Sequence, residues 1–127
     1  MRHEQTAVLV VEDDFLIRMN AVDIFERAGL TVYEASNADE AIRVLKSRED
    51  IRLVFTDINM PGSMDGLGLA HRVSETWPSV ALIVTSGRVN LRTASLPAQG
   101  VFIAKPYRAD QILREMRQMI GADALLH

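Results

Sequence analysis

The chain has 127 residues, of which 48% are hydrophobic and 24% are charged, with a formal net charge of -3. This length and composition predict a single globular domain over residues 1–127, with nothing left over for an output domain. The negative net charge argues against direct binding to nucleic acid, which requires a basic face. The absence of cysteine excludes disulfides and thiolate metal sites.

Membrane and export signals are also missing from the sequence. No apolar run approaches the ~20 residues of a membrane-spanning helix. The first residues, MRHEQT, lack the apolar core of a signal peptide. We therefore expect a cytoplasmic protein without membrane contacts.

The first half of the chain alternates between strand and helix patterns. Apolar residues at helical spacing from Ile17 to Ala28 predict a helix closed by Gly29. Asn37 is a good N-cap for the next helix, and Glu40 completes the pattern of a capping box. The strands expected beside these helices are Ala7–Val11 and Leu30–Ala35.

The second half continues the alternation. A helix around Leu67–Val73 should stop before Pro78, and a last helix should run from Ile112 to Gly121. The stretch 90–97 has few strong helix formers, so any fourth helix there should be short. The strands expected in this half are Arg52–Thr56, Val80–Ser86 and Gly100–Ala104. Five such βα units predict an α/β fold with a doubly wound parallel sheet.

Polar residues follow four of the five predicted strands. In open parallel sheets, ligands bind at the carboxyl ends of the strands, so these residues should gather at one edge. The acids are Glu12, Asp13 and Asp14 after the first strand and Asp57 after the third. Ser86 and Gly87 end the fourth strand, and Lys105 ends the fifth.

Three clustered carboxylates need a compensating charge, because two of them about 4 Å apart repel by roughly 4 kcal/mol at an effective dielectric near 20. Mg²⁺ suits such a cluster, since it takes oxygen ligands and bridges to phosphate. With Asp13 and Asp57 on the metal, Lys105 and Ser86 would contact further phosphoryl oxygens, and Gly87 would leave room. Asp57 would then accept the phosphoryl group as an acyl phosphate.

A simpler interpretation exists for each of these residues. Acids that follow a strand often only cap the next helix, and for Glu12, Asp13 and Asp14 the two interpretations carry equal weight. Asp57 alone would be an ordinary residue before a turn. The phosphoryl-transfer hypothesis rests on four strand ends that each supply a suitable group.

The segments VLVVEDD, VFTDINMPG, IVTSG and AKPY, in this order, resemble the receiver domain of bacterial two-component response regulators. The resemblance covers nearly the whole chain and implies a flavodoxin-like fold with strand order 2-1-3-4-5. It implies that Asp57 is phosphorylated by a histidine kinase or histidine phosphotransferase. It further implies that the protein is a signalling switch and not an enzyme.

The resemblance also implies roles for the residues around Asp57. Mg²⁺ would be held by Asp13, Asp57 and the backbone carbonyl of Asn59, with Glu12 acting through a water. Ser86, with Gly87 beside it, and Lys105 would contact the phosphoryl group, and the bond from Lys105 to Pro106 would be cis. Phe102 would be the switch aromatic that reports phosphorylation.

Three features depart from the family pattern. The turn MPGSMDG has one residue more than the usual MPGMDG, and Phe102 stands where tyrosine is frequent. The stretch from Ser86 to Lys105 is short, which implies a shortened fourth helix. Tyr107 is a candidate to share the role of Phe102.

Two alternative functions stay open on the sequence. One is a receiver-shaped interaction module that is never phosphorylated. The other is a phosphatase that forms an aspartyl phosphate, although its usual second aspartate is replaced by Asn59. The downstream partner is unknown, and a homodimer is possible.

Overall fold

The computed structural model describes residues 6–87 and 96–121. Within these two ranges, nine elements follow one another: β1 (Ala7–Val11), α1 (Phe15–Arg27), β2 (Thr31–Ala35), α2 (Ala38–Ser47), β3 (Ile51–Asp57), α3 (Gly66–Thr76), β4 (Ala81–Ser86), β5 (Gly100–Ala104) and α4 (Ala109–Ile120). Most of the stretch in which a short fourth helix was expected lies outside the described residues, so α4 denotes the C-terminal helix.

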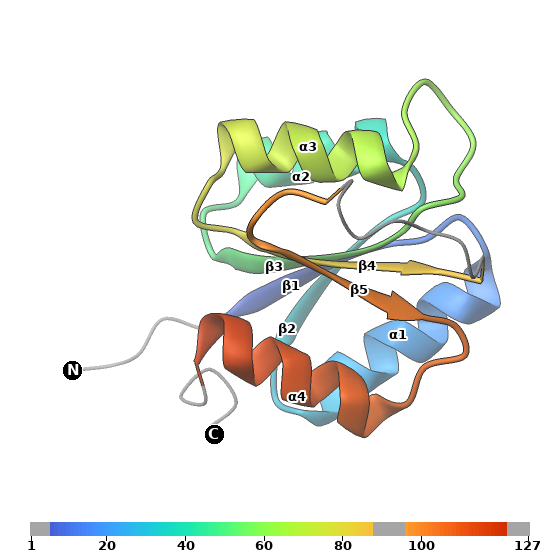
Figure 1. Ribbon diagram of the computed structural model, residues 1–127, viewed down its shortest axis with the longest axis vertical. Coiled ribbons are helices and arrows are strands. Elements are labelled where there is room, and N and C mark those ends of the chain that lie inside the picture. The colour runs from blue at the N-terminus through green and yellow to red at the C-terminus, as the bar shows by residue number, and fades with distance from the viewer. Residues whose placement is uncertain (1–5, 88–95, 122–127) are drawn as a thin grey trace.

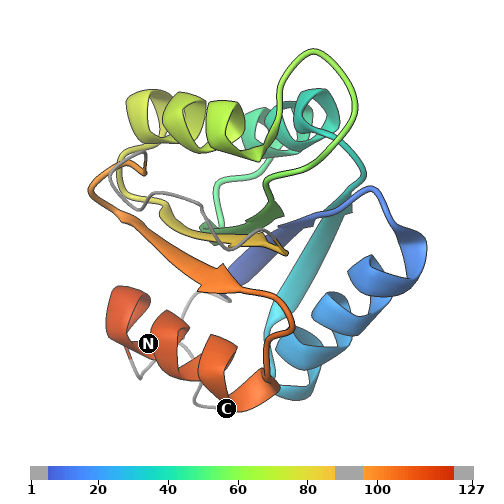
Figure 2. The same cartoon turned by 45° about the vertical axis from the view of Figure 1, so that its right-hand side comes forward.

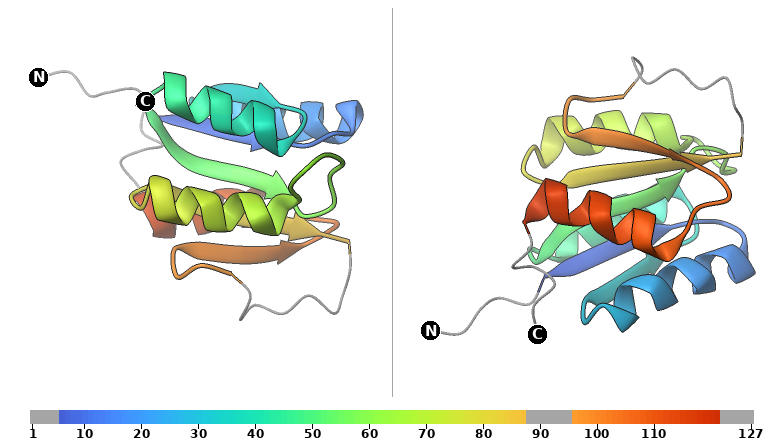
Figure 3. Two further views of the ribbon diagram at one scale, coloured as in Figure 1. Left: turned by 90° about the horizontal axis from the view of Figure 1, so that it is seen from above. Right: turned by 60° about the horizontal axis from the view of Figure 1, so that its bottom comes forward.

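The five strands form one parallel sheet in the order β2-β1-β3-β4-β5. The predicted fold class and strand order are therefore confirmed. Helices α2 and α3 cover one face of the sheet, and α1 and α4 cover the other (Figure 1). The view from above places α2 beside α3, and the view from below places α1 and α4 across the opposite face (Figure 3).

The core consists of two apolar layers, one on each face of the sheet, because successive strand residues point to opposite sides. In β1, Ala7, Leu9 and Val11 pack toward α2 and α3, whereas Val8 and Val10 pack toward α1 and α4. All residues of β1 and β4 are buried, while the edge strands β2 and β5 are partly exposed. Continuous apolar runs thus correspond to the central strands.

The helix boundaries follow from local signals in the sequence. Asn37 caps α2 by accepting a hydrogen bond from the backbone of Glu40 at 2.8 Å. The return bond differs from the predicted capping box, because the Glu40 carboxylate accepts from the backbone N–H of Ser36 at 2.5 Å. Gly29 and Gly121 follow α1 and α4 with positive φ, the conformation that favours glycine after a helix.

The carboxyl ends of the strands lie at one edge of the sheet (Figure 2). Because α4 runs antiparallel to the strands, its last residues lie at the opposite, amino edge, close to the start of β1 (Figure 1). The described residues before β1 and after α4 are therefore remote from the carboxyl edge, where the polar residues were expected.

Candidate functional site

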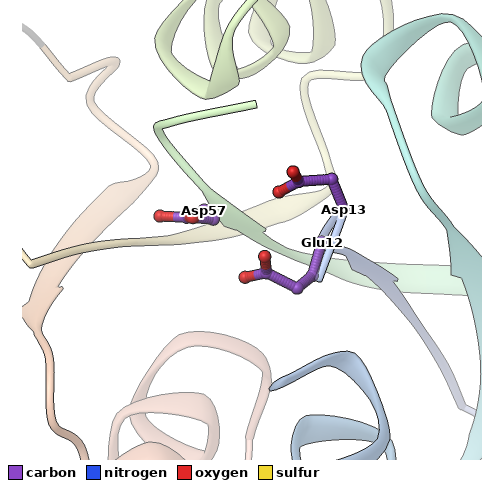
Figure 4. Close-up of side chains that lie close together, drawn as sticks. All are labelled: Glu12, Asp13 and Asp57. Carbon is purple, nitrogen blue, oxygen red and sulfur yellow. The ribbon is translucent and has the colours of Figure 1, made fainter. Parts of the chain in front are cut away.

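Three carboxylates meet at the carboxyl edge of the sheet. Glu12 and Asp13 directly follow β1, and Asp57 is the last residue of β3. One oxygen of each carboxylate lies within 4.8 Å of the others. The three carboxyl groups point to the same side of the strand ends (Figure 4). Glu12 and Asp57 are 5% and 7% exposed, while Asp13 is open to solvent.

Lys105 supplies the positive charge of this cluster. It follows β5, and its Nζ lies 3.2 Å from Asp57 Oδ2 and 3.5 Å from Glu12 Oε1. Its side chain is 21% exposed, so these ion pairs are only partly screened by solvent. The backbone N–H of Lys105 donates to the carbonyl of Ser86 at 2.9 Å, which fixes the end of β5 against the end of β4.

The carboxylate of Asp57 keeps one oxygen without a protein partner. Asp57 Oδ2 pairs with Lys105, whereas Asp57 Oδ1 is buried and accepts no hydrogen bond. A buried acceptor without a partner is costly unless an ion, a water or a ligand completes it. Glu12, Asp13 and Asp57 together offer carboxylate oxygens as ligands, and these are the ligands that Mg²⁺ prefers. The residues therefore fit a magnesium ion.

The turn from β1 to α1 divides its three acids between two tasks. Asp14 caps α1, because its Oδ1 accepts from the backbone N–H of Ile17 at 3.0 Å. Glu12 and Asp13 do not cap the helix and instead join the carboxylate cluster. The sequence could not decide between capping and chemistry, and the structure contains both.

Burial raises the pKa of the Glu12 carboxyl above its ordinary value, and the nearby Asp57 charge adds to this increase. The backbone N–H of Asp14, which donates to Glu12 Oε2 at 3.1 Å, and the Lys105 ammonium act in the opposite direction. A cation bound among these acids would favour the ionised form of Glu12.

The loop after Asp57 is held tightly against the end of β3. The N–H of Gly66 donates to the carbonyl of Ile58 at 2.8 Å, and Thr56 Oγ1 donates to the carbonyl of Asp57 at 3.0 Å. A Cβ on Gly66 would lie 2.1 Å from the Asp57 carbonyl oxygen, so only glycine fits there. Asn59 lies exposed in this loop, and the role of its carbonyl stays a prediction.

The extra residue of the MPGSMDG turn is tied to α2. Counting from the usual pattern, Ser63 is the additional position, and its hydroxyl lies 3.3 and 3.4 Å from the two carboxylate oxygens of Asp39. Asp39 belongs to the first turn of α2. The longer loop is therefore attached to a neighbouring helix at the surface.

Ser86 is the last residue of β4, the strand next to the one that carries Asp57, and Gly87 directly follows it. Ser86 ends β4 and is buried, one position beyond the pair of Thr85 with Asp57. Gly87 is exposed, and a Cβ there would meet no atom within 4 Å. The space that was expected at Gly87 exists, while the contacts of both residues with a phosphoryl group stay predictions.

Phe102 and Tyr107 lie on opposite faces of the sheet. Phe102 is partly buried against the layer under α2 and α3. Tyr107 packs edge-on against Phe55, at 5.5 Å between ring centroids, in the layer under α1 and α4. Tyr107 therefore cannot share the packing site of Phe102, although it follows the cis bond between Lys105 and Pro106 that was predicted.

Sequence reasoning overlooked Arg18. Its guanidinium donates to the backbone carbonyl of Glu12 in the acidic turn and to the carboxylate of Glu34 on β2. The one signal for this residue was a cation one helical turn after the acidic segment. That spacing is common in helices, so it gave no reason to single out Arg18.

Comparison with known proteins identifies the family. The sequence profile of the response regulator receiver domain matches residues 8–117, so the chain belongs to this family. It is a receiver domain of two-component response regulators, a class of signalling modules. Among the described residues, no helix has the length and apolar character needed to cross a membrane.

Relatives carry this domain both alone and within longer proteins. The response regulator receiver protein CpdR of Brucella abortus (strain 2308) is 32% identical over 118 residues, covering 91% of this chain and 97% of that protein. The sensor kinase CckA of the same organism is 32% identical over 117 residues, covering 89% of this chain and 12% of the kinase. Several curated relatives are longer, and the chain spans 12% to 48% of their length.

A solved structure of a response regulator receiver protein from Sinorhizobium medicae WSM419 has the same fold, with a TM-score of 0.85 and 27% sequence identity. The match covers 94% of this chain and 97% of that one. The sequence-based recognition of the family is thus confirmed.

Proposed function

We propose that the chain is a phospho-acceptor switch in which Asp57 takes a phosphoryl group from a phosphohistidine of a kinase or phosphotransferase. The observation that carries this proposal is the environment of Asp57. Its carboxylate is buried at the carboxyl edge, one oxygen is paired with Lys105, and the other has no protein partner. Two further acids lie within reach of a shared cation.

In the transfer step, an oxygen of the ionised Asp57 carboxylate attacks phosphorus and forms an acyl phosphate. The bond between phosphorus and the donor's imidazole nitrogen breaks, and the nitrogen keeps the electron pair. The nucleophile in this step is the carboxylate anion itself, so the transfer needs no general base to remove a proton from Asp57. The chain's task is therefore to orient the acceptor and to neutralise the added charge.

Asp13, Asp57 and the backbone carbonyl of Asn59 would hold Mg²⁺, with Glu12 acting through a water. A bound magnesium ion neutralises phosphoryl charge and aligns the reacting oxygens. Lys105 would neutralise a second phosphoryl oxygen, since its ammonium already lies beside Asp57. Ser86 would donate its hydroxyl to the third oxygen, and Gly87 leaves that approach open.

The output would arise at β4 and β5. Ser86 and Lys105 are joined through the 2.9 Å backbone hydrogen bond, so a movement of either residue affects both strand ends. Phe102 lies on β5 opposite Val84 of β4, and its partial burial leaves it free to repack. Two packings of this region, biased by phosphorylation, would present different surfaces to a downstream protein.

An apolar surface beside the acids would receive the phosphodonor. Phe15, Leu16, Ile17 and Met19 are the exposed large apolar residues of the described chain, and all belong to the first turns of α1. Leu16 is 77% exposed. Because α1 starts directly after the acidic turn, a donor helix seated on this patch would bring its histidine toward Asp57.

Intact mass after incubation with acetyl phosphate and Mg²⁺ tests the acceptor. We expect one added phosphoryl group on the wild type and none on Asp57→Asn. Asp50→Asn is the matched control, because Asp50 also has a buried oxygen without a partner but lies at the start of β3, away from the acids. Phosphorylation of Asp57→Asn would contradict the proposal.

Two further outcomes separate the alternatives. A folded wild type that gains no phosphoryl group from acetyl phosphate or from a phosphorylated kinase would indicate an interaction module. Sustained hydrolysis of a phosphate ester would indicate a phosphatase.

Leu16→Glu should slow transfer from a phosphorylated histidine protein and leave labelling by acetyl phosphate unchanged, because the small donor needs no docking surface.

A further inference from the structure

Arg18 connects three parts of the structure around the acidic turn. It lies in the second turn of α1, and its side chain is only 16% exposed. Its terminal nitrogen donates to the backbone carbonyl of Glu12 at 2.8 Å, and its Nε donates to Glu34 Oε1 at 3.0 Å. The guanidinium also lies 5.5 Å from the centroid of the Phe15 ring.

The backbone carbonyl of Glu12 lies between the two acids that follow β1. It belongs to the peptide between Glu12 and Asp13, so its orientation affects the direction of both side chains. The N–H of Glu12 is held by the carbonyl of Ala35 on β2 at 3.0 Å, but the register of β1 with its neighbours ends at Val11. Beyond Val11, the hydrogen bond from Arg18 to the Glu12 carbonyl holds the backbone in place of strand pairing.

We propose that Arg18 is a positioning residue for the metal site, holding the peptide between Glu12 and Asp13 so that both carboxylates face Asp57. The proposal rests on the magnesium binding proposed above. Glu34 has a supporting role, because its carboxylate fixes the guanidinium from the side of β2. Arginine suits this task, since its planar group reaches two acceptors at once, whereas a lysine ammonium is a single point.

A purely structural role for Arg18 is the competing explanation. Helix α1 already has the Asp14 cap and a buried face formed by Ala21, Val22, Ile24 and Phe25. These contacts hold the helix on the sheet without help from Arg18. Loss of its side chain should therefore affect the geometry of the acids more than the stability of the fold.

The test compares Arg18→Lys and Arg18→Gln with Arg27→Gln. Arg27 is also on α1 and also pairs with an acid, Asp23. That pair is exposed and lies at the C-terminal end of the helix, away from the acidic turn. We expect the dissociation constant for Mg²⁺, measured by calorimetry, to rise about tenfold in both Arg18 variants, the magnitude typical for residues that orient metal ligands. Arg27→Gln should bind Mg²⁺ like the wild type.

A second measurement does not require the metal. In the presence of EDTA, the amide resonance of Asp13 and the carbonyl resonance of Glu12 should shift in both Arg18 variants and stay unchanged in Arg27→Gln. If the wild type bound no Mg²⁺, the proposed function would fail, while these resonances would still report whether Arg18 holds the turn.

Three results would overturn the proposal for Arg18. Wild-type Mg²⁺ affinity in Arg18→Lys would show that a positive charge at position 18 is enough for metal binding, without the planar guanidinium. Unshifted resonances of Glu12 and Asp13 would show that the turn after β1 keeps its conformation without Arg18. A loss of urea stability in Arg18→Lys that accounts for the whole loss of affinity would show a structural role. Should Arg18→Gln fail to fold, Arg18→Lys decides the question, because it retains the charge and most of the packing.

Discussion

Substitution of Lys105 by methionine should destabilise the metal-free protein and make its stability strongly dependent on Mg²⁺. Methionine keeps most of the length of the lysine side chain and removes only the charge. Without that charge, the folded state would contain the carboxylates of Glu12, Asp13 and Asp57 within 4.8 Å of one another and no cation beside them.

The magnitude follows from the distances at Lys105. Its Nζ lies 3.2 Å from Asp57 Oδ2 and 3.5 Å from Glu12 Oε1. Each contact amounts to about 5 kcal/mol of attraction at an effective dielectric near 20. Desolvation of the ammonium offsets much of this, and removal of one partner from a buried pair typically costs about 3–5 kcal/mol. Because the Lys105 side chain is 21% exposed, we expect the lower end, about 3 kcal/mol.

Urea unfolding in EDTA and in millimolar Mg²⁺ measures both effects. Lys105→Met should be less stable than the wild type in EDTA, and Mg²⁺ should stabilise the variant more than it stabilises the wild type. Binding to the folded state alone adds stability in proportion to the logarithm of ligand concentration over the dissociation constant. Lys46→Met is the matched control, because Lys46 is the only other lysine of the sequence and lies exposed at the end of α2.

Equal stability of Lys105→Met and the wild type in EDTA would refute this reasoning. An equal increase of stability with Mg²⁺ in the two proteins would do the same. Either result would mean that the acids tolerate one another without the lysine, through water or through protonation of Glu12, whose pKa is already raised by burial.

Two other substitutions test the surroundings of the site. Gly66→Ala should cost about 1–3 kcal/mol of unfolding free energy, as overpacking usually does, because its Cβ would meet the backbone of Asp57 and Ile58. Gly68→Ala is the control, since there the nearest atom is the side-chain Cγ of Met64, which can move away; equal losses would disprove the close approach at Gly66. Glu40→Gln should cost about 1 kcal/mol at neutral pH, the usual value of a helix cap. Hydrogen bonds from Ser36 lower the pKa of Glu40 in the folded state, so the ionised carboxylate stabilises above its ordinary pKa of 4.5 and this contribution is lost as the pH falls. The difference from the wild type in urea unfolding should therefore shrink at acidic pH, and a constant difference would contradict this assignment.

The sequence was sufficient for the features that depend on local pattern. The apolar runs predicted the strands to within two residues at either end, and the polar residues after them predicted the cluster of Glu12, Asp13 and Asp57. This works because parallel strands bring their carboxyl ends to one edge, so order along the chain translates directly into proximity.

Features that depend on contacts between distant segments escaped prediction. Arg18 meets Glu34 across sixteen positions of sequence, and no spacing rule connects them. The faces of Phe102 and Tyr107 were equally hidden, because the turn at Pro106 separates the two aromatic residues. For the acidic turn, the choice of Asp14 as the cap depended on backbone geometry that residue types alone do not reveal.

The placement of both described ends at the amino edge has a consequence for how this unit combines with other proteins. A polypeptide joined before β1 or after α4 would start on the far side of the sheet from Asp57. Fusion at either end would therefore leave the carboxyl edge around Asp57 uncovered by the added segment. The segments that match this chain make up 12% of the kinase CckA and 97% of the small protein CpdR. The points of attachment and the carboxylate cluster are thus separated by the length of the strands.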